Sequence, residues 1–212
     1  MLVDPEPETL ELQNCVSLDG QRKLLAELFT RHRDRLRSMV DLRLDPRLRG
    51  RIDPSDVLQE AFVESLLRLK DFLSAPPMAF FLWLRCITGN AIITVHRRHF
   101  RGKRDARREV SLDQALPEAS SARLAACLMH KGPSPGKAAS RAELRSQLER
   151  ALEGMDFLDR EVIALRHFEG LSNGEVAATL GLEVSAASKR YYRALAKLKK
   201  ILADMGIEAP ED

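Results

Sequence analysis

LDREVIALRHFEGLSNGEVAATLGLEVSAASKRYYRALAKLKKIL, residues 158–202, is the stretch that decides the fold expected for the C-terminal part of the chain. Within it, residues 172–175 (SNGE) have the pattern of a capping box. In such a box the Ser172 hydroxyl accepts a hydrogen bond from the Glu175 amide, and the Glu175 carboxylate accepts one from the Ser172 amide. We therefore expect a short helix from Ser172. It should end at Gly181, because glycine readily adopts the left-handed conformation that reverses the chain.

A second helix is expected after this turn, from Val184 or Ser185. Its apolar residues recur at helical spacing and form a stripe that should be buried: Ala187, Tyr191, Leu195, Leu198 and Leu202. Its opposite face is basic and carries Lys189, Arg190, Arg193, Lys197, Lys199 and Lys200. Two helices joined by a tight turn, the second of them basic, predict a helix-turn-helix whose second helix reads bases in the major groove. Taken alone, these residues also fit a helical hairpin whose charged face is only solvated.

The composition favours an all-helical protein. The 212 residues are 44% hydrophobic and 31% charged, whereas aromatic residues make up only 5% and β-branched runs are few. The longest apolar segment, Met78 to Leu84, is far shorter than the ~20 residues that span a bilayer, and no N-terminal stretch resembles a signal peptide. The separated cysteines Cys15, Cys86 and Cys127 indicate neither a disulfide framework nor a metal site. We expect a cytoplasmic protein with no membrane partner, no cofactor and no metal.

Charge is unevenly distributed along the chain, although the net charge is only +3. Residues 1–20 contain acidic side chains and no lysine or arginine, which predicts an acidic flexible leader. Basic residues gather in residues 96–108 and in the last helix. Two separate basic clusters predict two contacts with a polyanion.

Three further helices are expected in the N-terminal half. A stripe of apolar residues predicts one helix over residues 21–44. Asp53 followed by Pro54 is a strong start for a second helix, which the apolar pattern continues to about Lys70. Pro77 then opens a long helix that leads directly into the first basic cluster.

Two sets of motifs resemble bacterial RNA polymerase sigma factors of the extracytoplasmic-function (ECF) type. Residues 56–62 (DVLQEAF), then residues 81–87 (FLWLRCI) with Asn90 and the arginine-rich tail, resemble the second conserved region of that family in order and spacing. The C-terminal stretch resembles the fourth conserved region through three motifs: REVI at 160–163, EGLS at 169–172 and RAL at 193–195. The resemblance covers about residues 24–108 and 141–202.

This resemblance implies an all-α fold with two small helical domains joined by a flexible linker. The expected order is an acidic flexible leader (1–20), a region-two helical bundle (21–108), a linker (109–139) and a region-four helix-turn-helix domain (140–205). The linker has room for one short helix, from Ala122 to Met129.

Such a protein binds core RNA polymerase and directs it to promoter DNA, and the resemblance assigns residues to each step. Docking on polymerase is assigned to Asp56, Gln59, Glu60 and Phe62. Recognition and melting of the minus-ten element is assigned to Phe72, which would hold a flipped base, to Asn90 beside it, and to a cationic track of Arg97, Arg98 and Arg101. Recognition of the minus-thirty-five element is assigned to Ser185, Ala186, Ser188, Lys189, Arg190, Tyr192 and Arg193.

Two other functions fit less of the sequence. An enzyme is not expected, because the five histidines are scattered and no set of acidic residues has metal-site spacing. A stand-alone helix-turn-helix regulator would need a dimerisation or ligand-sensing domain, whereas residues 20–108 carry the docking pattern. The promoter, the inducing signal and the regulator stay open, with a separate anti-sigma factor and a partner kinase as candidate controls.

Overall fold

The computed structural model describes residues 6–48, 50–100, 117–130 and 138–204. Within these ranges every regular element is helical and none is a strand, which confirms the all-α prediction. The chain divides into two compact units, Met1–Pro117 (unit 1) and Glu118–Asp212 (unit 2). Each unit has its own apolar core.

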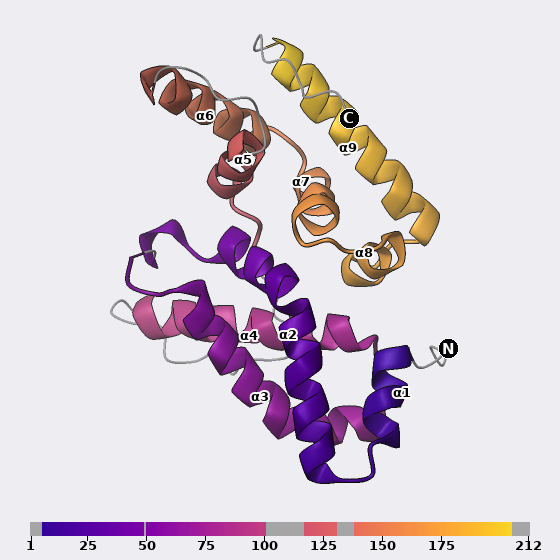
Figure 1. The fold of residues 1–212 in the computed structure, drawn as a ribbon. Coiled ribbons are helices and arrows are strands. Elements are labelled where there is room, and N and C mark those ends of the chain that lie inside the picture. Colours follow the sequence, from indigo (N-terminus) through magenta and orange to yellow (C-terminus); the bar gives the residue numbers. More distant parts are fainter. Residues whose placement is uncertain (1–5, 49, 101–116, 131–137, 205–212) are drawn as a thin grey trace. The chain divides into compact units, whose positions relative to one another are not determined.

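Unit 1 is a helical bundle (Figure 1). Its helices are α1 (Pro7–Asn14), α2 (Leu18–Arg43), α3 (Pro54–Ser74) and α4 (Phe80–Phe100), with a short 3₁₀ turn, η1 (Pro46–Leu48), after α2. α3 lies beside α4, and α2 packs on both of them. The largest fully buried side chains of this core include Leu28, Leu36, Phe80, Leu84 and Ile92.

The start of α3 follows from its sequence. The Asp53 carboxylate accepts from the Ser55 amide at 2.7 Å, and the Asp56 carboxylate accepts from the Asp53 amide at 3.2 Å. With Pro54 in the first turn, these bonds form a capping box and confirm the helix start expected at Asp53. The helix then continues to Ser74, beyond its expected end.

Pro7–Asn14 form helix α1, so the expectation of a flexible leader is wrong for these residues. Leu12 of α1 is fully buried, and the Glu8 carboxylate lies 3.0 Å from Nε2 of His32 on α2. The hydrogen bond to His32 lowers the pKa of Glu8. The acidic composition predicted disorder, but an acidic segment can fold when it buries an apolar side chain and one of its acids finds a partner.

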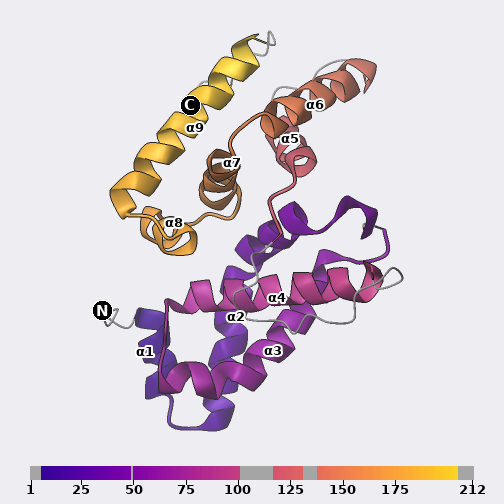
Figure 2. The ribbon, with the colours of Figure 1, turned by 180° about the vertical axis from the view of Figure 1, so that it is seen from behind.

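Unit 2 contains the C-terminal helices: α5 (Ser121–His130), α6 (Ala138–Glu153), α7 (Phe157–Ile163), α8 (Asn173–Leu180) and α9 (Val184–Asp204). α7 continues into a π-helical turn, η2 (Ala164–Phe168). Figures 1 and 2 both show α5 beside α6, and α8 at the N-terminal end of α9.

Part of the expected linker belongs to unit 2. α5 packs against α6, and Leu124 and Ala125 of α5 are fully buried. The short helix expected at 122–129 is therefore present, but it is part of a folded unit rather than of a free connection. Residues 109–116 and 131–137, also expected in the linker, lie outside the described residues.

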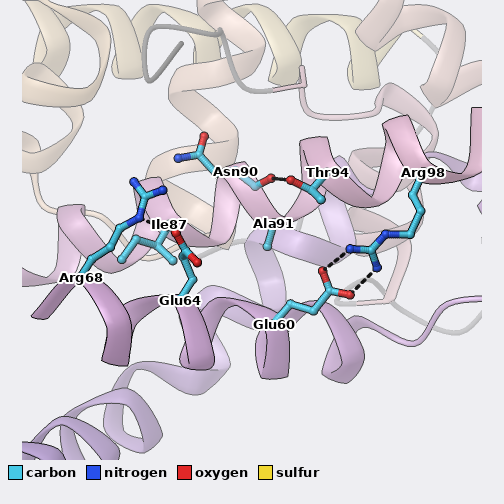
Figure 3. Close-up of a pocket in the computed structure, with 8 residues that line it drawn as sticks. All are labelled: Glu60, Glu64, Arg68, Ile87, Asn90, Ala91, Thr94 and Arg98. Atoms are coloured by element: carbon cyan, nitrogen blue, oxygen red, sulfur yellow. Dashed lines mark hydrogen bonds and ion pairs between the residues drawn. The ribbon is translucent and has the colours of Figure 1, made fainter. Parts of the chain in front are cut away.

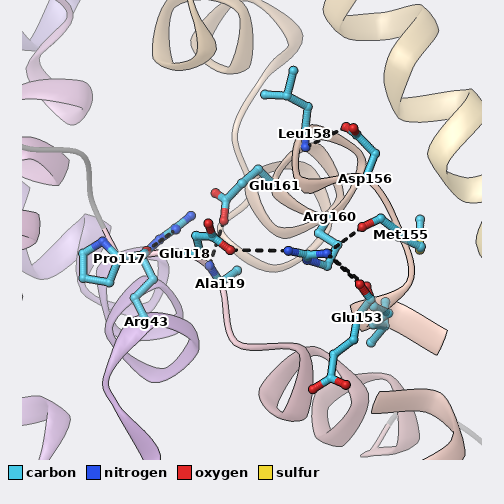
Figure 4. A network of polar contacts seen from close by, with 11 residues as sticks. Arg43, Pro117, Glu118, Ala119, Glu153, Met155, Asp156, Leu158, Arg160 and Glu161 are labelled. Carbon is cyan, nitrogen blue, oxygen red and sulfur yellow. Dashed lines mark hydrogen bonds and ion pairs between the residues drawn. The ribbon is translucent and has the colours of Figure 1, made fainter. Parts of the chain in front are cut away.

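Two charged residues of α7 hold the chain that precedes α5 (Figure 4). Glu161, which is buried, accepts from the Ala119 amide at 2.7 Å, and Nη2 of Arg160 donates to the Glu118 carboxylate at 3.3 Å. Nη1 of Arg160 also donates to the Met155 carbonyl at 2.6 Å. These bonds fasten residues 118–119 to α7 and give the REVI motif a structural role.

Candidate functional site

α8 and α9 form the helix-turn-helix expected from the sequence. The Ser172 amide donates to Oε2 of Glu175 at 2.6 Å, and the Glu175 amide donates to the Ser172 hydroxyl at 3.2 Å, so the predicted capping box is confirmed. α8 is followed by Gly181, whose φ of 64° lies in the left-handed region that favours glycine. The chain turns there and α9 begins at Val184, as predicted.

One face of α9 is exposed near its N-terminal end. The residues of the expected reading set that are exposed on α9 are Ser185, Ala186, Lys189, Tyr192 and Arg193. Tyr192 is 68% exposed, so its ring and its hydroxyl are open to a ligand. Ser188 is half-buried, and its hydroxyl lies 3.5 Å from Nδ2 of Asn173 on α8. We call the five exposed residues the reading face.

Arg190, which is also expected to contact DNA, points toward α7 instead. Its Nη1 donates to Oδ1 of Asp156 at 3.1 Å and to Oδ1 of Asp159 at 3.0 Å. Asp159 is only 3% exposed, and its second oxygen accepts from Nζ of Lys197 at 2.5 Å. In the free chain the guanidinium of Arg190 is therefore held by two carboxylates at the start of α7 and is not part of the exposed face.

The residues expected to dock on polymerase lie in the N-terminal half of α3. Asp56 and Gln59 are exposed, while Glu60 and Phe62 are half-buried. Phe62 packs edge-on against Phe29 of α2, with ring centroids 5.1 Å apart. Gln59 and Phe62 also line a mainly apolar groove of about 480 Å³ between α2 and α3.

Two apolar residues outside the expected docking set extend this surface. Val63 and Leu67 of α3 are 55% and 72% exposed, although most apolar residues of unit 1 are buried. They are four residues apart, so they lie on one face of the helix. The sequence signal that could have identified them is helical periodicity: Val63 and Leu67 are apolar but lie outside the buried stripe of α3, which includes Ala61 and Leu69.

A second groove, of about 380 Å³, lies between α3 and α4 (Figure 3). At one end of it the guanidinium of Arg98 donates to both oxygens of Glu60, at 2.8 and 3.4 Å. Asn90 lines the same groove. Asn90 and Arg98, both expected to contact minus-ten DNA, therefore lie in one groove with Glu60, which is expected to contact polymerase. Of the other arginines in the expected cationic track, Arg97 is half-buried on α4, and Arg101 lies outside the described residues.

Phe72 does not lie in a loop that could hold a base. It belongs to α3, is 3% exposed, and stacks on Trp83 with ring centroids 4.4 Å apart and planes 20° from parallel. Phe80 packs edge-on against Phe72, with ring centroids 6.1 Å apart. In this structure the Phe72 ring is therefore buried in an aromatic cluster and is not open to a flipped base. Trp83 is 8% exposed and packs in the same cluster.

Two other kinds of site do not occur within the described residues. No helix in the described ranges combines the length and the apolar composition needed to cross a bilayer. In the same part of the chain, no group of three or more His, Cys, Asp and Glu side chains comes together as a metal site would require.

Several known RNA polymerase sigma factors are similar to this chain. Residues 145–198 match the family "Sigma-70, region 4". RNA polymerase sigma factor CnrH of Cupriavidus metallidurans is 33% identical over 151 residues, which cover 71% of this chain and 73% of CnrH. ECF RNA polymerase sigma factor SigE of Mycolicibacterium smegmatis is 29% identical over 186 residues, which cover 87% of this chain and 64% of SigE. The solved structure of CnrH in complex with the cytosolic domain of CnrY superimposes with a TM-score of 0.52 and 25% identity, over 94% of this chain and 99% of that one.

Proposed function

The chain belongs to the ECF family of RNA polymerase sigma factors. We propose which of its surfaces bind polymerase and which bind each promoter element. As a sigma factor it binds core RNA polymerase and directs promoter-specific transcription initiation. The observation that carries the proposal is the reading face of α9, where Lys189, Tyr192 and Arg193 are exposed on a capped helix-turn-helix.

Unit 2 is the reader of the minus-thirty-five element. In a helix-turn-helix the N-terminal half of the second helix enters the major groove, and the reading face occupies that half of α9. Lys189 and Arg193 are one turn apart and carry the cationic donors that suit the acceptor edge of guanine. Lys199 and Lys200 are exposed further along the helix, where they suit phosphates instead.

Unit 1 docks on polymerase through α3. Asp56, Gln59 and Glu60 supply polar contacts, and Phe62 borders the apolar groove beside them. Exposed apolar residues that adjoin such a groove are typical of a protein contact surface. We therefore add Val63 and Leu67 to the docking surface.

The C-terminal half of α4 binds the minus-ten element. Asn90 offers an amide to a base edge, and the arginines at 97, 98 and 101 offer cations to an opened strand. In the free chain Arg98 is paired with Glu60, so Arg98 must leave Glu60 before it can contact DNA. Polymerase that engages Glu60 would release Arg98 to DNA, which couples the two contacts.

We also propose that a separate protein controls this chain. The similar solved structure holds CnrH with the cytosolic domain of CnrY. An anti-sigma factor acting here would cover the docking surface of α3 or the reading face of α9. We assign the chain no catalytic activity of its own and place it in the cytoplasm, where core polymerase meets promoters.

In vitro transcription on a library of genomic fragments tests the proposal. With core polymerase and the chain together, we expect initiation on a limited set of fragments that share two sequence elements upstream of the start. Core polymerase alone is the control and should not select these fragments. If the same fragments are transcribed with and without the chain, the proposal fails.

A further inference from the structure

Asp159 on α7 is a buried acid that holds two cations of α9. Its Oδ1 accepts from Nη1 of Arg190 at 3.0 Å, and its Oδ2 accepts from Nζ of Lys197 at 2.5 Å. Asp156, which caps α7 through the Leu158 amide, accepts from the same nitrogen of Arg190 at 3.1 Å. α7 and α9 are thus joined by charge-assisted hydrogen bonds, which are stronger than neutral ones.

The spacing of the two cations restricts how α9 is turned about its axis. Arg190 and Lys197 are two helical turns apart, so their backbone positions are separated by about 10 Å along one side of the helix. Their side chains converge on a single carboxylate. Bonds that converge from two turns resist both rotation of α9 about its axis and sliding along it.

The apolar contacts of α9 do less to choose its orientation. Its buried residues are Ala187, Ala194 and Leu198, and Tyr191, Leu195 and Leu202 of the expected stripe are half-buried. Burial of apolar area is non-directional, so it holds the helix down without selecting one angle. The charge-assisted hydrogen bonds to the buried Asp159 carboxylate, in contrast, have fixed directions and favour one arrangement of the helix.

The orientation of α9 matters because the reading residues flank Arg190. Lys189 precedes it, and Arg193 follows it by one turn. A roll of about 20° would move an atom at the surface of the helix by about 2 Å, since the helix with its side chains has a radius of about 5–6 Å. Hydrogen bonds tolerate only about 0.5 Å in donor–acceptor distance. Base contacts would change although no DNA-contacting residue had been replaced.

We propose that Asp159 positions the recognition helix and thereby sets the base preference at the minus-thirty-five element without touching DNA. The inference rests on the proposed function of unit 2 as the reader of that element. Arg190 and Lys197 transmit the position, and Asp156 contributes by holding the same guanidinium as Asp159.

Asp159→Asn in the full chain, assembled with core RNA polymerase, tests the proposal. Asparagine keeps the size of the side chain but loses the charge that holds both cations. Binding is measured on promoters randomised at the minus-thirty-five element. We expect a changed order of preferred bases, and a discrimination between best and mismatched sequences that falls about tenfold. Glu183→Gln removes the same charge from an exposed residue before α9 and should keep the order of preference.

Lys197→Met is the second variant. The Lys197 side chain is 57% exposed, so this substitution should leave α9 folded. It should change the order of preferred bases in the same direction as Asp159→Asn, by a smaller factor. If Asp159→Asn does not fold, Lys197→Met alone decides. If the folded variants lose affinity by one common factor for every sequence, Asp159 only stabilises unit 2 and the inference is overturned. If the unmodified chain shows no preference at this element, the proposed function of unit 2 fails instead.

Discussion

Arg98 on α4 donates to Glu60 on α3 at 2.8 and 3.4 Å, so a cation proposed for promoter DNA is held by a carboxylate proposed for polymerase. The two side chains are 57% and 40% exposed. Ion pairs as exposed as this one typically contribute about 0.2–1 kcal/mol. A DNA phosphate can therefore replace Glu60 as the partner of Arg98, and a cationic side chain of polymerase can replace Arg98 as the partner of Glu60.

Replacing Glu60 by glutamine should release Arg98. We expect the affinity of the free chain for non-specific duplex DNA at low salt to rise by up to about fivefold, which corresponds to the loss of an exposed ion pair. Fluorescence anisotropy with a labelled duplex measures the change. Glu11→Gln alters the charge equally on an exposed position of α1 and is the control. Equal DNA affinities for the two variants would show that Glu60 does not restrain Arg98.

Leu67→Asp should weaken docking on polymerase. Leu67 is 72% exposed in the free chain, and burying a leucine contributes about 1.5–3 kcal/mol, so affinity for core polymerase should fall at least about tenfold. Leu18→Asp, at a 69% exposed leucine at the start of α2, is the matched control. Pull-down of core polymerase measures both variants, with circular dichroism to confirm unchanged helix content. An undiminished pull-down with Leu67→Asp would remove this residue from the docking surface.

Glu8 should make unit 1 sensitive to acid. The hydrogen bond to His32 lowers its pKa from the ordinary value of 4.5, so its contribution to the free energy of unfolding is present above pH 4.5 and is lost as the pH falls through the lowered value. We expect Glu8→Gln to cost about 1.5–3 kcal/mol at neutral pH, as for other hydrogen bonds to charged groups. The variant should also lose less stability than the unmodified chain in acid.

Urea unfolding followed by the fluorescence of Trp83, the single tryptophan of the chain, measures the stability of unit 1 at each pH. Glu11→Gln, on the same helix but exposed, removes an equal charge and is the control. The same acid dependence in Glu8→Gln and in the unmodified chain would mean that the bond to His32 adds no stability.

Residues that read bases should behave differently from residues that hold phosphates. Lys189→Ala and Arg193→Ala should each cost about 1–3 kcal/mol on the preferred minus-thirty-five sequence and relax discrimination at particular base pairs. Replacing Lys199 and Lys200 together should weaken all sequences alike and flatten the salt dependence. Binding of the holoenzyme to a randomised library at two salt concentrations separates the two patterns. If the Lys189 and Arg193 variants lose affinity equally for every sequence, these two residues contact only the DNA backbone.

The features that could be predicted from the sequence depend on neighbouring residues. The capping box at Ser172 and the helix start at Asp53 depend on residues at most three apart, and the turn at Gly181 needs only a glycine that can take a positive φ. Helical periodicity, which is also a local pattern, predicted the apolar stripe of α9: Ala187 and Leu198 are buried, and Tyr191, Leu195 and Leu202 are half-buried. These signals were sufficient for the all-α fold and for the helix-turn-helix.

The features that could not be predicted depend on residues far apart in the sequence. α1 is held by the contact of Glu8 with His32, which are 24 residues apart. Arg190 is turned toward Asp159, 31 residues before it, and periodicity on α9 contains no information about a carboxylate on α7. Phe72 was expected to hold a flipped base, and its stacking on Trp83 is a tertiary contact that no local pattern reveals.

Footprinting of one promoter by the free chain and by the holoenzyme tests most directly whether the chain recognises promoters as a polymerase subunit. Each unit alone offers few phosphate contacts, so its binding should be weak and salt-sensitive. We expect the holoenzyme to protect both promoter elements at concentrations at which the free chain protects neither. Equal protection by the free chain would contradict this account, because it would mean that the chain binds its site without polymerase.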